Sequence, residues 1–292
     1  MYANSIKNDH RGAIYGIANI FILTPTLFAA LIGGRIVDQY GGLTVQGIKP
    51  IYLLQLFLLV VAWLSVYWRL RDKIPNQVNE KPSLREMFTD YEDVLKRKGT
   101  KAWIGMKSLG SISIGLAGPF WMLFAASIHG ASAITISYMV TARSIVNILL
   151  SPLSGRLTDS IGRKWMILSG RVVMYIATII FLVLGSFEIY LILAWVLMGV
   201  TDSTNVAWQA QEVELVNHTQ RARMTALSVS AFNLLAVPAS VLGRWLWDSI
   251  NPLAPFIIMF IVDGFIRMPI VYKYIPDSKL LEKEQEPEDA NL

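Results

Sequence analysis

Long apolar stretches separated by short polar connections dominate this chain of 292 residues. Each stretch approaches the ~20 residues that a helix needs to cross the hydrocarbon core of a bilayer. The stretches cover about residues 13–36, 51–69, 103–128, 132–154, 165–186, 188–210, 222–247 and 252–275. The pattern therefore predicts an all-α integral membrane protein with eight transmembrane helices.

The amino-acid composition supports the assignment of the chain as a membrane protein. Hydrophobic residues make up 54% of the chain and charged residues 16%, and the mean hydropathy is +0.47. There are no cysteines, which excludes disulfides, thiolate metal sites and cysteine nucleophiles. The net charge of +5 is spread over the connections instead of forming one stripe, so we expect a lipid bilayer as partner and no nucleic acid.

The basic residues also predict the orientation in the membrane. Nineteen Lys and Arg residues fall in the termini and connections of one side, against Arg35, Lys49 and Arg244 on the other. We therefore expect both termini in the cytoplasm and the protein in the plasma membrane. The basic residues within spans are Lys107, Arg143, Arg171 and Arg267. Of these, Lys107 and Arg171 lie near cytoplasmic span ends and are expected to snorkel.

The longest connection divides the chain. We predict a two-helix part of an N-terminal bundle at 1–69, a cytoplasmic linker at 70–102, a C-terminal six-helix bundle at 103–275, and a disordered cytoplasmic tail at 276–292. Within the linker, Ser83 and Glu86 form a capping box before apolar residues at helical spacing, and Gly99 is a suitable stop. This helix is interpreted as lying on the membrane surface; docking of a partner is the alternative.

An internal repeat links the two bundles. A shift of 210 residues superimposes Arg11 on Arg221, Gly33 on Gly243 and Asp38 on Asp248, without a gap. Each copy has a cytoplasmic Arg, an apolar helix, small residues near the far end and then an Asp. Such duplicated helices are typical of transporter folds.

A compact charged segment lies between two of the spans. It contains Gly155, Asp159, Gly162, Arg163 and Lys164. Gly155 permits close approach of backbones, Asp159 suits a helix N-terminus, and Arg163 with Lys164 favour the cytoplasmic side. The segment resembles the loop signature of the Major Facilitator Superfamily, except that Ser160 stands where the family usually has a basic residue.

The resemblance implies a specific register on the family's twelve-helix plan. The charged segment corresponds to the connection between the eighth and ninth helices, so the first span here resembles the fifth. The chain is therefore expected to supply helices five to twelve and to lack the first four. A split gene, a frameshift, a misplaced start and a designed truncation all remain open. The resemblance also implies that the seventh, eighth, tenth and eleventh helices line a cavity while the ninth and twelfth pack outside.

Polar residues on two expected cavity helices mark the candidate substrate or coupling site. Arg143 and Asn147 share one face of the eighth-helix equivalent, and Asp202 and Asn205 share one face of the tenth. Arg143 and Asp202 lie near the middle of their spans, where a charge is costly and usually faces a cavity or a partner. We expect the two to lie close together. Arg143 is then either an anchor for an anion or substrate, with Asp202 as partner or proton carrier, or half of a fixed ion pair.

Two other sets of residues in the spans favour structural roles. Asp263 and Arg267 are spaced i,i+4 on the last span and are expected to pair with each other. Trp121, Trp195 and Trp208 lie deeper than the other tryptophans, which suits stacking on an apolar substrate, although packing is the favoured interpretation.

No enzymatic signature appears in the sequence. The three His residues are far apart, and no metal-ligand spacing, phosphate-binding loop or nucleophile motif is present, so neither a metal nor a cofactor is predicted. The predicted function is secondary transport of a small solute by alternating access, by this chain or by a transporter of which it is a fragment. The alternative is a remnant or subunit that does not transport without a separately encoded N-terminal part or self-association. In a transporter, the resemblance implies that Asp159 docks near Ala222 at the start of the eleventh-helix equivalent and acts in gating.

Overall fold

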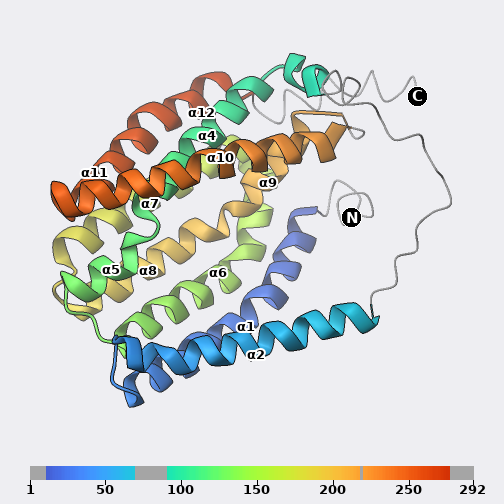
Figure 1. Ribbon diagram of the computed structural model, residues 1–292. Coiled ribbons are helices and arrows are strands. Elements are labelled where there is room, and N and C mark those ends of the chain that lie inside the picture. The colour runs from blue at the N-terminus through green and yellow to red at the C-terminus, as the bar shows by residue number, and fades with distance from the viewer. Residues whose placement is uncertain (1–10, 70–90, 218–219, 277–292) are drawn as a thin grey trace.

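A computed structural model describes residues 11–69, 91–217 and 220–276, with side chains from Thr24 onward. The described residues are helical, with no strand. The helices are α1 (Arg11–Gln39), α2 (Val45–Arg69), α4 (Thr100–Ala117), α5 (Phe120–Ser127), α6 (Ala133–Ile161), α7 (Arg163–Leu184), α8 (Glu188–Ser203), α9 (Asn205–Glu214), α10 (Arg221–Ser249), α11 (Ala254–Ile261), the π-helix η4 (Val262–Arg267) and α12 (Met268–Tyr274). They lie roughly along one another as a bundle (Figure 1).

Seven helical segments of the described chain are long and apolar enough to cross a membrane. They correspond to the second to eighth predicted spans, and α1 occupies the first. The prediction of an all-α membrane fold is thus confirmed, and the number of spans is close to the eight expected. Residues 277–292 of the tail predicted at 276–292 and the start of the chain at 1–10 lie outside the described residues.

Three of the predicted spans are interrupted helices. Residues 103–128 divide into α4 and α5 at Gly118 and Pro119, because Pro119 has no N–H with which to continue the helical hydrogen bonds. Residues 188–210 divide into α8 and α9 at Thr204, whose hydroxyl donates to the Thr201 carbonyl at 2.7 Å. The last span contains the π-turn η4. Two of the interrupted spans are neighbours, since α4 packs on α11 and on η4.

The charged segment at 155–164 is not an extended loop. Helix α6 continues to Ile161 and α7 begins at Arg163, so Gly162 alone separates them. Gly162 has a φ of 96°, which a residue with a side chain rarely adopts. The apolar spans predicted at about 132–154 and 165–186 are therefore parts of longer helices, because charged residues can continue a helix beyond the bilayer core.

The predicted repeat coincides with two long helices. α1 and α10 each have 29 residues and begin at Arg11 and Arg221, which preserves the shift between the copies. Each packs along another long helix, α1 on α6 and α10 on α4. Small residues permit both contacts: Gly34 of α1 lies against Ser137, and Gly243 of α10 lies against the Leu116 carbonyl. The matching lengths and packing support the repeat.

The residues before α4 pack on the second bundle. Residues 91–96 are helical, and Val94 is fully buried in a core cluster with Trp103 and Met106. Residues 83–90, which hold the predicted capping box, lie outside the described residues. The described end of this linker helix thus packs against the protein. The interpretation as a helix on the membrane surface did not predict this packing.

Helix α2 is the most exposed apolar helix of the described chain. None of its membrane-spanning window is buried, whereas half of the window from Thr100 to Ser127 is. Its neighbour in the fold is α1. Such a helix suits a lipid environment, where apolar side chains need no protein cover.

Candidate functional site

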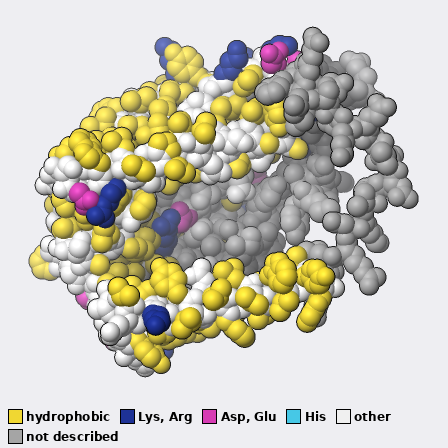
Figure 2. Space-filling view, viewed as in Figure 1, with side chains coloured by type: hydrophobic (Ala, Val, Ile, Leu, Met, Phe, Trp, Pro, Cys, Tyr) yellow, Lys and Arg dark blue, Asp and Glu magenta, His cyan; other side chains and the backbone are white. Residues whose placement is uncertain are grey.

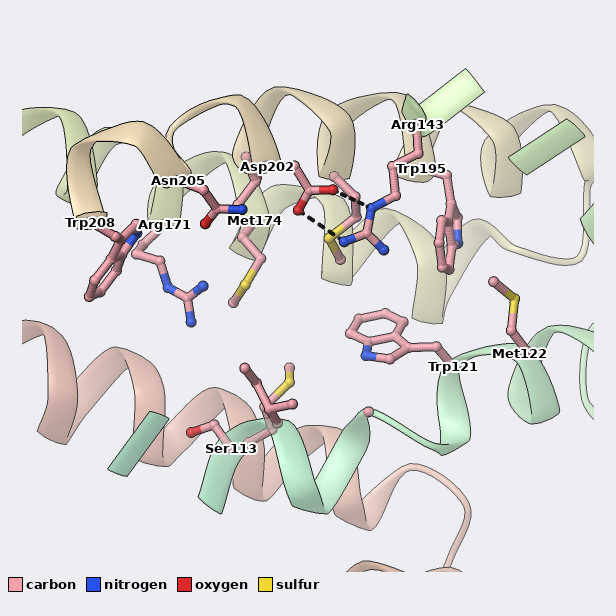
Figure 3. A pocket seen from close by; sticks show the side chains of 15 residues that line it. Ser113, Trp121, Met122, Arg143, Arg171, Met174, Trp195, Asp202, Asn205 and Trp208 are labelled. Atoms are coloured by element: carbon pink, nitrogen blue, oxygen red, sulfur yellow. Dashed lines mark hydrogen bonds and ion pairs between the residues drawn. The ribbon is translucent and has the colours of Figure 1, made fainter. Parts of the chain in front are cut away.

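A cavity of about 420 Å³ lies inside the second bundle. Fifteen residues line it: Ser113, Ile114, Gly118, Trp121, Met122, Arg143, Arg171, Met174, Trp195, Met198, Thr201, Asp202, Asn205, Trp208 and Met259 (Figure 3). The described parts of α1 and α2 contribute none of them. The volume is in the range of small-molecule sites, and a mostly apolar wall with a few polar groups is their usual composition.

Arg143 of α6 and Asp202 of α8 meet at this cavity. Arg143 Nε donates to Asp202 Oδ2 at 2.6 Å, and Arg143 Nη2 donates to Oδ1 at 2.9 Å. The guanidinium also lies 5.0 Å from the centre of the Trp195 ring. The side chains stay 35% and 23% exposed, so the pair remains accessible from the cavity. The expected proximity of the two residues is confirmed.

The two asparagines of the candidate site lie differently. Asn205 lines the cavity and is exposed. Asn147 is buried, accepts a hydrogen bond from Ser151 Oγ at 2.9 Å and does not line the cavity. A shared helix face is therefore insufficient to bring Asn147 to the cavity one turn beyond Arg143.

A second ionic cluster closes another part of the cavity wall. Asp263 Oδ1 accepts from Arg171 Nη2 at 2.6 Å and from Arg267 Nη1 at 2.7 Å. Its Oδ2 accepts from Arg171 Nε at 2.9 Å and from the Tyr175 hydroxyl at 2.7 Å. The expected pair of Asp263 and Arg267 is confirmed. The expectation that Arg171 snorkels was wrong, because α7 places its guanidinium against a carboxylate of the last span.

Arg267 is accommodated by close packing around its guanidinium. Its Nε donates to the Met106 carbonyl at 3.1 Å, and its Cζ lies 4.7 Å from the centre of the Trp208 ring. Gly110 of α4 provides the space, since a Cβ there would lie 2.6 Å from Arg267 Cζ. A charge so deeply buried needs these partners, which come from α4 and α9 in addition to Asp263 on η4.

Lys107 also has a partner inside the protein. Its Nζ lies 3.1 Å from Glu212 Oε2 of α9, and that carboxylate accepts from Trp103 Nε1 at 3.1 Å. The expectation that Lys107 snorkels was therefore wrong as well. The exposed fractions of the Lys107 and Glu212 side chains are 23% and 9%, so the pair is a partly buried link between α4 and α9.

The comparison with known families decides what kind of bundle this is. Residues 104–291 match the family model of the Major Facilitator Superfamily. The chain belongs to the Major Facilitator Superfamily. Members of this superfamily are transporters. A search of curated proteins found no match to the chain.

The helices that line the cavity differ in part from those implied by the superfamily resemblance. The equivalents of the seventh, eighth and tenth helices do contribute, through α4, α5, α6, α8 and α9. The eleventh-helix equivalent, α10, supplies no lining residue, whereas α7 supplies Arg171 and Met174 and α11 supplies Met259. The cavity therefore extends between the helices toward those expected outside. Figure 2 shows a hollow between α10 and α2 on the face drawn, with acidic and basic side chains inside it.

The three deep tryptophans serve both roles considered for them. Trp121, Trp195 and Trp208 all line the cavity. They are also packed: Trp121 makes edge contacts with Phe181 and Phe256, and Trp208 lies 5.8 Å from Trp103 between ring centres. Packing thus holds the rings in place while one part of each faces the cavity.

The superfamily's signature segment is tied to other elements by its basic residues. Arg163 forms an ion pair with Glu214 at the end of α9, and Lys164 Nζ donates to the Ile275 carbonyl at 3.2 Å. Gly155 is buried on α6, and Asp159 is exposed on the last turns of that helix. The docking of Asp159 near Ala222 stays a prediction.

Sequence reasoning missed Arg171, Tyr175 and Glu212 as partners. Arg171 and Tyr175 share an i,i+4 spacing on α7, and both reach Asp263. That spacing, together with an aspartate in a later span, was the available signal. Glu212 carried none, because its position after the predicted span at 188–210 is typical of a solvated connection.

Proposed function

We propose that this chain provides the substrate-binding bundle of a secondary transporter, which moves a small solute across the plasma membrane by alternating access with both termini in the cytoplasm. The observation that supports the proposal is the ion pair of Arg143 and Asp202, which is bonded through two hydrogen bonds yet open to a cavity with tryptophan walls. A charge pair kept accessible at mid-span is characteristic of a solute pathway.

The absence of cysteine from the natural sequence permits a test that needs no known substrate. Asn205→Cys places a thiol in the cavity, and a membrane-impermeant maleimide is applied to right-side-out or inside-out vesicles of the native cells, which also contain any separately made N-terminal part. Alternating access predicts labelling from both sides, because the cavity opens to each in turn. Labelling from one side only, under all conditions, would contradict the proposal.

Two matched variants give the sidedness. Ser160 is exposed on the last turn of α6, and Ser186 is exposed in the turn that follows α7. Ser160→Cys should be labelled from the cytoplasmic side alone and Ser186→Cys from the opposite side alone. The reverse pattern would contradict the proposed orientation while leaving the alternating-access test valid.

We further propose that flux requires a second wall, supplied by a separately made N-terminal fragment or by self-association. None of the described residues of α1 or α2 lines the cavity, and alternating access rocks one bundle against another around a shared site. Liposomes with this polypeptide alone should therefore show no solute flux, and the purified protein should be oligomeric or unstable. Robust flux by the polypeptide alone would overturn this proposal.

A further inference from the structure

Three guanidinium groups and two carboxylates form the ionic networks that reach the cavity. Among the described residues, the charged groups that line the cavity are Arg143, Asp202 and Arg171. Arg143 pairs with Asp202, whereas Arg171 pairs with Asp263, which in turn pairs with Arg267 behind the wall. One positive charge is therefore left without a matching carboxylate. An uncompensated charge inside a membrane bundle is costly, and an anion in the cavity would reduce that cost.

The surplus charge is located at Arg171. Arg143 has a carboxylate of its own, since both of its bonded nitrogens donate to Asp202. Arg171 shares Asp263 with Arg267 and with the Tyr175 hydroxyl. The carboxylate that neutralises Arg171 is thus divided among three donors.

The position of Arg171 suits contact with a ligand. It lines the cavity, and its side chain is 14% exposed, whereas Asp263 is fully buried behind it. Figure 3 shows its guanidinium extending into the open space between Trp208 and Met174, on the side away from Arg143 and Trp195. The third donor nitrogen, Nη1, has no hydrogen-bond partner among the described residues and can donate to an anionic oxygen.

The other lining residues indicate which kind of ligand body the cavity favours. Trp121, Trp195 and Trp208 present ring surface, and Met174, Met198 and Met259 present polarisable apolar groups. Such walls favour an aromatic or apolar body, because rings stack and thioethers adapt to irregular shapes. We propose that the cavity binds an organic anion with an aromatic or apolar body, and that Arg171 holds its anionic group; this substrate class rests on the function proposed above.

The test compares probes that share a naphthalene body and carry a negative, a neutral or a positive polar group. The full chain in lipid nanodiscs is dialysed to equilibrium against 2-naphthoate, 2-naphthylmethanol or 2-naphthylmethylamine, and empty nanodiscs give the background partitioning into lipid. We expect the carboxylate to bind about tenfold or more tightly than the alcohol and the amine, as a charge-assisted hydrogen bond would produce. Equal affinity for all three, including no binding of any, would overturn the inference, as would preference for the amine.

Variants test whether Arg171 causes the preference for the carboxylate probe. Arg171→Gln should reduce 2-naphthoate affinity about tenfold and leave the affinity for the alcohol unchanged, whereas Arg171→Lys should keep most of the charge preference. Both Arg171 variants leave Asp263 paired with Arg267, so the buried carboxylate keeps a cation. Arg244→Gln on α10 removes an exposed arginine paired with Asp248 and is the matched control, with no expected change. An equal loss in both Gln variants would contradict the assignment to Arg171.

The outcome can be separated from that of the proposed function. Preference for the carboxylate with labelling of Asn205→Cys from one side only would support the substrate class and contradict alternating access. Labelling from both sides with no charge preference among the probes would support alternating access and overturn the substrate class. A carboxylate contributed by another segment facing the cavity would produce that second result.

Discussion

Two clusters of charged side chains lie in the same bundle and are satisfied in different ways. The pair of Arg143 and Asp202 is balanced one to one, and the Asp202 side chain is 23% exposed. In the cluster of Arg171, Asp263 and Arg267, two cations share one carboxylate that is fully buried. Accessible charges can rearrange with water or ligand, whereas buried ones have no substitute for the partner they lose. The pair of Arg143 and Asp202 is therefore suited to rearrangement during a transport cycle. Asp263 is suited to holding α7 to the last span.

The largest effect should come from removing the shared carboxylate. Asp263→Asn leaves two guanidinium groups facing each other without an anion, which should destabilise the fold by about 3–5 kcal/mol. Thermal unfolding of the purified protein, followed by size-exclusion chromatography, would measure the loss. Asp248→Asn, which breaks the exposed pair with Arg244, should cost less than about 1 kcal/mol. Similar losses in the two variants would remove the distinction between buried and accessible pairs.

A smaller effect should follow when space beside the buried cluster is removed. A Cβ at Gly110 would lie 2.6 Å from Arg267 Cζ, so Gly110→Ala should displace the guanidinium and destabilise the protein by about 1–3 kcal/mol. The same unfolding assay applies. A Cβ at Gly105, on the same helix, would have no atom within 4 Å. Gly105→Ala should therefore be neutral or stabilise the protein by up to ~1 kcal/mol. Equal stability of the two variants would show that Arg267 moves without cost.

The accessible pair should respond in conformation more than in stability. Asp202→Asn should change the unfolding free energy by about 1 kcal/mol or less, because both side chains are partly exposed. It should change the ratio of outside to inside labelling of Asn205→Cys by about fivefold, which corresponds to a coupling near 1 kcal/mol. The double exchange Arg143→Asp with Asp202→Arg should restore part of that ratio if the pair acts as a unit. Independent losses without restoration would indicate two separate roles.

The smallest effect is expected at a carboxylate outside both clusters. Asp159 is exposed, so Asp159→Asn should leave insertion and folding intact. Loss of a charge that favours a helix N-terminus is worth about 0.3–1 kcal/mol, enough to shift the labelling ratio of Asn205→Cys two- to fivefold. Ser160→Ala, at the next residue, is the control. A ratio equal to that of the parent in the Asp159 variant would exclude the gating role.

The sequence predicted those contacts whose signal is local or positional. Asp263 and Arg267 are one helical turn apart, and Arg143 and Asp202 are both charged at mid-span, where few alternatives exist. Arg171 was misread because its only clue was its distance from the span end, and a long arginine at that depth is compatible with either water or a buried carboxylate. Which helix lies opposite is a property of tertiary packing that one sequence does not encode locally.

The π-turn η4 has a consequence for the helical phase of the last span. A π-turn accommodates one extra residue, and each residue of an α-helix corresponds to a rotation of about 100°. Everything after Arg267 is therefore rotated relative to a regular helix that starts at Ala254. Met268 and Val271 face the core in this phase. Removing one residue from 262–267 would rotate them by about 100° away from the core and bring neighbouring residues of α12 inward, so a single deletion here would change which side chains of the last turns meet lipid.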